Sequence, residues 1–214
     1  MPQLDAVRPG YAELNGVNTQ TLSGQGLSEL SAVQVGTDMV SDFVSDGSET
    51  VSLTFSPTTE GVFDLDIENP DSSERLENGL MVFDPTNTSH RVLGAIPARV
   101  RASDSITVVG GGFTAATTAQ VSGQAVVVSL QSPNRIELDV PNGLGPGQHT
   151  VRVQTGGQIA NTNIHIYRTP IITTVTPDEG MGGGTTAITI TGTNFRDIEA
   201  VSYTHLTLPT TPYV

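Results

Sequence analysis

The chain has 214 residues, of which 36% are hydrophobic and only 5% aromatic, and its formal net charge is −13 at pH 7. All nine basic residues are Arg, and the absence of Lys and Cys excludes Schiff-base, phosphate-loop lysine, thiol and disulfide chemistry. The acidic balance argues against nucleic-acid binding, which needs neutralising basic side chains. No stretch reaches the roughly 18 apolar residues required for a membrane-spanning helix, and the N-terminus has no basic start followed by an apolar block, so no signal peptide is predicted.

The first part of the chain is predicted to consist of short strands. Apolar and polar residues alternate in TVSLTFSP and GVFDLDIEN, which places Val51 and Leu53 on one face and Leu65 and Ile67 on another. One face of each strand is therefore expected in a core and the other in water. About seven such strands, separated by turn signals, predict an immunoglobulin-like β-sandwich over residues 1–84.

The same pattern returns twice, at a spacing of roughly 85 residues, which is a whole-domain period. Each copy has a short apolar run ending in Pro and then a strand that ends in Gly, any residue, Gly or Asn, and Leu or Phe. The predicted structural turn positions are Gly24, Gly26, Gly110, Gly112, Gly192 and Asn194. We expect tight turns there, because Gly tolerates positive φ and a phosphate-binding loop would need a helix after the glycines. The copies predict a second sandwich at 85–168 and the beginning of a third at 169–200.

The third copy, PIITTVTPDEGMGGGTTAITITGTNF, resembles the start of an IPT/TIG domain, the immunoglobulin-like fold shared by plexins and some transcription factors. The matching features are the strand ending in Pro177, the turn at Gly182–Gly184, the ITITG strand and the TNF that follows it. The resemblance implies an all-β chain of tandem sandwiches from a bacterial cell-surface or secreted protein, with an extracellular location. Short linkers such as RTP at 168–170 are expected to make a semi-rigid rod, since Pro stiffens a joint.

Residues 201–214, VSYTHLTLPTTPYV, match neither earlier copy. They resemble the translation of a transposon sequencing adapter, so we expect them to be a non-native tail that is not part of the native fold. The chain is then expected to be a gene fragment from bulk DNA sequencing, with the third domain interrupted.

Candidate chemistry in the sequence is sparse. Asp64, Asp66 and Glu68 alternate along one predicted strand, so that their carboxylates share its outer face and could bind calcium. The simpler interpretation is a solvated strand face. No catalytic residue and no cofactor are predicted, because no His pair has ligand spacing and no nucleophile turn such as G-x-S-x-G occurs.

The first functional hypothesis is a non-catalytic structural or adhesive spacer in a larger surface or secreted protein. The expected partners are neighbouring domains of the same parent chain and an extracellular protein or polysaccharide. The alternative is an accessory module of a secreted polysaccharide-degrading enzyme, with carbohydrate binding as one role. A Rel-like DNA-binding unit is a third reading, and the acidic charge argues against it.

Overall fold

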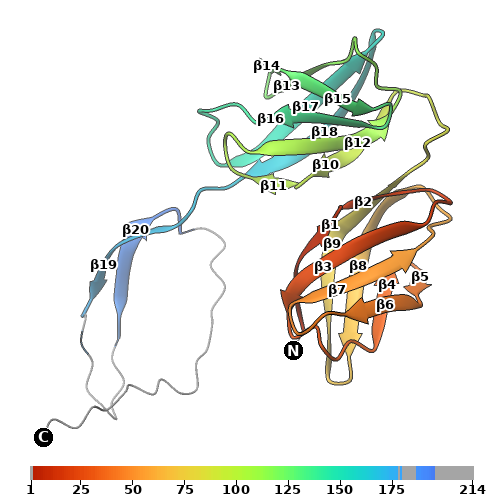
Figure 1. Cartoon of the computed structure of the whole chain (residues 1–214). Coiled ribbons are helices and arrows are strands. Elements are labelled where there is room, and N and C mark those ends of the chain that lie inside the picture. The colour runs from red at the N-terminus through yellow and green to blue at the C-terminus, as the bar shows by residue number, and fades with distance from the viewer. Residues whose placement is uncertain (1, 178, 180–186, 196–214) are drawn as a thin grey trace, which may run out of the picture. The chain divides into compact units, whose positions relative to one another are not determined.

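The computed structural model describes residues 2–177, 179 and 187–195. These residues form only strands, turns and loops, which confirms the all-β prediction. The described part therefore contains no helix that could cross a membrane. The chain divides into two compact units, Met1–Tyr167 and Arg168–Val214, and the first of them holds two β-sandwiches (Figure 1).

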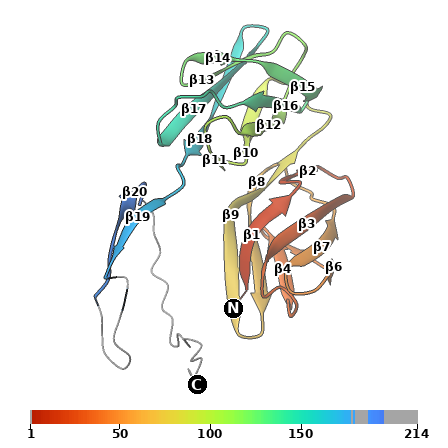
Figure 2. The ribbon, with the colours of Figure 1, turned by 60° about the vertical axis from the view of Figure 1, so that its left-hand side comes forward.

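The first sandwich has a four-stranded sheet, β1-β3-β7-β6, and a five-stranded sheet, β2-β9-β8-β4-β5. Its strands are β1 (Gln3–Arg8), β2 (Tyr11–Glu13), β3 (Asn18–Gln25), β4 (Ala32–Val35), β5 (Asp38–Val40), β6 (Asp42–Ser45), β7 (Thr50–Phe55), β8 (Gly61–Asn69) and β9 (Ser72–Phe83). Figures 1 and 2 show its two layers from two directions. Alternation along β7 and β8 buries Val51, Leu53, Leu65 and Ile67 between the layers, as the period of two predicts.

The second sandwich repeats this plan, with sheets β10-β12-β16-β15 and β11-β18-β17-β13-β14. Its strands are β10 (Arg91–Ile96), β11 (Arg99–Val100), β12 (Ser105–Gly111), β13 (Thr118–Val121), β14 (Gln124–Val126), β15 (Val128–Ser132), β16 (Arg135–Asp139), β17 (Gly147–Thr155) and β18 (Gln158–Ile166). Its core is separate from the first and is formed by side chains such as Ile136, Leu138, Val151 and Val153.

The equivalence of the two sandwiches extends to strand register. Leu4 pairs with Gly24 in the first and Val92 with Gly110 in the second, and a register shift follows at the next residue in both. The short strands β2 and β11 each pair in parallel with the last strand of their sandwich. This correspondence identifies equivalent positions residue by residue.

In the second unit the structure describes one antiparallel pair, β19 (Ile171–Thr176) and β20 (Thr189–Thr193). Ile172 pairs with Gly192, and the register again shifts after this pair. The pair therefore repeats the start of both sandwiches. Ile171, Ile172 and Ile190 of this pair are more than half exposed in this unit.

Candidate functional site at the joint between the two sandwiches

The two sandwiches of the first unit meet through a third apolar cluster, which is separate from both cores. Its buried members are Met81, Phe83 and Val109, and Tyr11, Leu93 and Ile96 pack against them. We call this cluster with its surrounding polar contacts the joint. It forms because both faces of the end of β9 are buried: Leu80 and Val82 point into the first core, whereas Met81 and Phe83 face the second sandwich.

Two glycines make room at the joint for side chains of the opposite sandwich. A Cβ added at Gly94 would lie 2.4 Å from the terminal methyl carbon of Met81. A Cβ added at Gly10 would lie 3.1 Å from Cγ2 of Ile96. The missing side chains leave the space that Met81 and Ile96 occupy.

Polar groups at the edge of the joint are also paired across it. The guanidinium of Arg135 lies 4.6 Å from the ring centroid of Tyr11 and donates a hydrogen bond to the Tyr11 hydroxyl. The Asn134 side-chain amide donates to the carbonyl of Asp84 at 3.3 Å and to that of Gly110 at 3.1 Å. The second sandwich is therefore fastened to both Tyr11 and the segment that follows β9.

A partly buried ion pair completes the joint. Arg91 Nε donates to Glu60 Oε1 at 3.0 Å and its Nη2 pairs with the same oxygen, with side-chain exposures of 19% and 27%. The backbone N–H of Asp84 donates to this oxygen as well, at 3.1 Å. Hydrogen bonds from the hydroxyl and the backbone N–H of Thr86 lower the pKa of Asp84. The connecting segment 84–90 is thus held by hydrogen bonds.

The three acidic residues proposed as a calcium site lie on β8, and a basic side chain contacts two of them. Arg75 Nε donates to Asp66 Oδ1 at 2.6 Å, and Arg75 Nη1 lies 3.5 Å from Asp64 Oδ2. The hydrogen bond to Asp66, and then its charge, raise the pKa of Arg75. Glu68 is exposed on the same strand. No group of three or more acidic or His side chains within the described residues is placed to hold a metal ion.

The predicted turn positions fall into two kinds. At Gly24, Gly110 and Gly192, an added Cβ would lie 1.9, 2.1 and 1.9 Å from a backbone carbonyl oxygen of the paired strand. These three positions require Gly because the strands approach closely, and φ is not in the left-handed region. Two residues later, Gly26, Gly112 and Asn194 have φ of 64°, 69° and 63°. The turn at Gly182–Gly184 and the tail 201–214 lie outside the described residues.

Sequence reasoning identified the strand NGLMVFD but missed the joint. The available signal was the unbroken apolar run Leu80–Phe83, which departs from the alternation seen in the equivalent strand β18. A continuous run of this kind indicates a strand that is buried on both faces. The polar members Glu60, Arg91 and Arg135 had no such signal, because their partners are distant in the sequence.

Tandem two-layer sandwiches with this strand order define the chain as a protein of immunoglobulin-like repeats. The family model of the IPT/TIG domain matches residues 94–166 and 170–210, together more than half of the chain. The chain therefore belongs to the IPT/TIG domain family. No curated protein matches its sequence significantly.

Solved structures with remote similarity include SGBP-B of the Bacteroides ovatus mixed-linkage glucan utilization locus in complex with a mixed-linkage heptasaccharide. It is 20% identical with a TM-score of 0.33, over 80% of this chain and 47% of that chain. The full extracellular region of plexin A4 is 15% identical with a TM-score of 0.36, over 78% of this chain and 18% of that chain. SGBP-B from a complex xyloglucan utilization locus in Bacteroides uniformis is 14% identical with a TM-score of 0.32, over 77% of this chain and 49% of that chain. The chain spans about half or less of the length of these structures.

Proposed function

We propose that the chain is a non-catalytic spacer of a larger bacterial cell-surface or secreted protein, in which the first two sandwiches act as one stiff element. The joint carries this proposal. It combines an apolar cluster that is buried at Met81, Phe83 and Val109 with the Arg91–Glu60 ion pair and the Arg135–Tyr11 contact. Flexibly linked domains need no such contacts, and the default expectation for neighbouring domains is relative motion unless their interface is large and apolar.

Spin-label distances test the stiffness directly. Because the chain has no Cys, introduced cysteines are the only labelling sites. We expect the pair Ser73→Cys and Gln148→Cys, both at exposed positions in different sandwiches, to give a single narrow distance distribution. The pair Ser48→Cys and Ser73→Cys, within the first sandwich, supplies the reference width. A distribution between sandwiches that is several times broader than this reference would refute a stiff element.

The extracellular location is part of the same proposal. We expect the gene that contains these repeats to encode a secretion signal. A complete reading frame without such a signal would contradict the location without affecting the stiffness.

The second candidate function is an accessory, carbohydrate-binding module of a secreted polysaccharide-degrading enzyme. It is favoured by a groove in the first sandwich that contains Asp38 and Phe55. A catalytic domain encoded next to these repeats would support this candidate over a plain spacer.

A further inference from the structure

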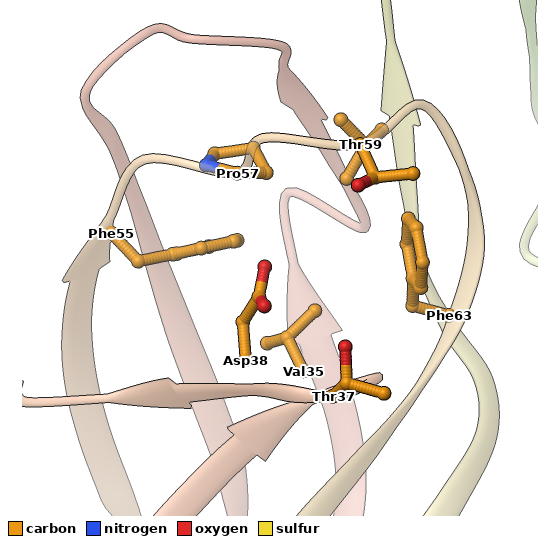
Figure 3. Close-up of a pocket in the computed structure, with 8 residues that line it drawn as sticks. Val35, Thr37, Asp38, Phe55, Pro57, Thr59 and Phe63 are labelled. Carbon is orange, nitrogen blue, oxygen red and sulfur yellow. The ribbon is translucent and has the colours of Figure 1, made fainter.

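A groove opens between the layers of the first sandwich, where the β4–β5 hairpin faces the end of β7. It consists of two adjoining cavities of about 90 and 420 Å³, which share Thr37, Asp38 and Phe55. The larger cavity lies within the range of roughly 300–1,000 Å³ that is usual for small-molecule sites. Figure 3 shows the smaller cavity, with the Asp38 carboxylate pointing into the space between Phe55 and Phe63.

The aromatic wall of the groove is held in place by the backbone. A Cβ added at Gly36, where φ is +60°, would lie 2.6 Å from Cδ1 of Phe63. A Cβ added at Gly61 would lie 3.3 Å from Cζ of the same ring. The Phe63 ring thus fits against two positions that lack side chains, and both Phe63 and Phe55 pack against the first core. The rings are already positioned without a ligand.

The polar lining has unused hydrogen-bonding capacity. Five hydroxyls line the larger cavity beside Asp38: Thr37, Ser41, Thr54, Ser56 and Thr58. Among the described residues, neither these hydroxyls nor the Asp38 carboxylate have an intramolecular partner. Other hydroxyls of the same sandwich do: Ser45 donates to the carbonyl of Leu27 and Thr50 to that of Asp46, each at 3.1 Å.

This set of groups matches one ligand chemistry. Hydroxyls both donate and accept, a carboxylate accepts, and an aromatic ring offers an apolar face. A saccharide ring presents hydroxyls around its edge and C–H groups on its faces, so it can use all three. An acidic sugar would be repelled by Asp38 and by the net charge of −13. We propose that this groove binds a neutral oligosaccharide.

The equivalent place in the second sandwich is filled by its own hydrogen bonds. By strand register, Phe63 corresponds to His149 and Gly36 to Ser122. His149 Nε2 donates to the carbonyl of Gly145 at 2.8 Å, and its Nδ1 accepts from the Ser122 hydroxyl at 2.7 Å. The counterparts of Phe63 and Gly36 thus bond to each other, so this part of the groove differs between the two sandwiches.

The test is a titration of the full chain with cellohexaose, xylohexaose and mannohexaose, in which the amide resonances are monitored by NMR. We expect at least one of these neutral sugars to shift the resonances of Thr37–Met39 and Ser56–Thr58. Asp38→Asn should weaken that binding about tenfold, which corresponds to about 1.4 kcal/mol and fits the loss of a charge-assisted hydrogen bond. Glu29→Gln removes the same charge from an exposed position outside the groove and should leave the affinity unchanged.

A second variant tests the groove without altering Phe55, which packs against the first core and whose replacement could unfold the sandwich. Thr58→Ala removes the hydroxyl and the methyl group of an exposed side chain of the groove and should weaken binding a few-fold at unchanged melting temperature. Binding that is equal in Asp38→Asn and in the unaltered chain would overturn the proposal. The proposal would also be overturned if the groove resonances shifted only with hexagalacturonate or only with a lysine hexapeptide. It would be overturned as well if none of these probes shifted them. The spacer role does not depend on these results, since the spin-label widths report it separately.

Discussion

The two sandwiches share one strand plan, yet their corresponding ends present different surfaces. At the end of the first sandwich that contacts the second, the outward positions of β2 and β9 hold Tyr11, Met81 and Phe83. The register-equivalent residues of the second sandwich are Arg99, His165 and Tyr167. The inward residues keep their apolar character in both, as Leu80 and Val82 in one and Ile164 and Ile166 in the other. The core face maintains the fold, whereas the outer face decides whether an end becomes an interface.

The largest expected difference between these ends concerns one aromatic position. Phe83 is 2% exposed in the joint, whereas its counterpart Tyr167 is 36% exposed. Phe83→Ala should cost about 3–5 kcal/mol of unfolding free energy, because it removes a buried ring and leaves a cavity. Tyr167→Ala should cost less than about 1 kcal/mol. Urea unfolding followed by circular dichroism measures both, and similar losses for the two variants would remove the distinction between the ends.

A smaller effect is expected from the ion pair of the joint. A double-mutant cycle of Glu60→Gln and Arg91→Met should give a coupling of about 1–2 kcal/mol, because both side chains are mostly buried. The Asp66–Arg75 pair, in which Arg75 is 59% and Asp66 20% exposed, should show a smaller coupling of about 0.5 kcal/mol in the cycle Asp66→Asn and Arg75→Met. A coupling at Glu60–Arg91 as small as that of the surface pair would mean that the joint depends on apolar packing alone.

One core position is polar in the first sandwich and apolar in the second, where Gln20 corresponds to Ile106. Gln20 is 1% exposed; its side-chain amide donates to the carbonyl of Tyr11 at 3.2 Å, and its Oε1 has no partner among the residues that the structure describes. Gln20→Ile should therefore stabilise the first sandwich by about 1 kcal/mol, since an unsatisfied buried acceptor is removed. Thr21→Ile, on the exposed side of the same strand, is the control and should change the unfolding free energy little. A destabilised Gln20→Ile variant would show that the hydrogen bond to Tyr11 outweighs the unpaired oxygen.

The smallest expected effect is the pH dependence of the segment that connects the sandwiches. The pKa of Asp84 lies below its ordinary value of 3.8, mainly because the Thr86 hydroxyl donates to the carboxylate. A lowered folded-state pKa stabilises the protein above pH 3.8, and this contribution is lost as the pH falls through the folded pKa. Thr86→Ala should therefore lower the melting temperature slightly at pH 6, and the difference from the unaltered chain should shrink at pH 3. A difference that is constant over this range would rule out the Asp84 carboxylate as its source.

Part of the molecule could be predicted from the sequence because its signals are local. Alternation in TVSLTFSP places Val51 and Leu53 in the core, and the sandwich class follows from several such strands. The Gly positions were recognisable from the repeat, and Gly26 and Gly112 have the positive φ expected of a turn, but the role of Gly24 and Gly110 was not recognisable. Gly24 and Gly110 are required by a carbonyl oxygen of the neighbouring strand, and no local pattern reveals that partner. Calcium binding by Asp64, Asp66 and Glu68 was the less favoured interpretation from the sequence, and in the structure Arg75 contacts the first two.

The sequence by itself determined the all-β class and the repeat, because periods of two and about 85 residues are properties of the chain alone. Only the tertiary structure decided that Met81 and Phe83 form a joint, that Arg91 finds Glu60, and that Asp38 lines an open groove. The physical reason is that an outward position in a strand has no fixed environment. Whether it is solvated, buried against a neighbour or left beside a cavity depends on segments far along the chain, and these come together only when the sheets have packed.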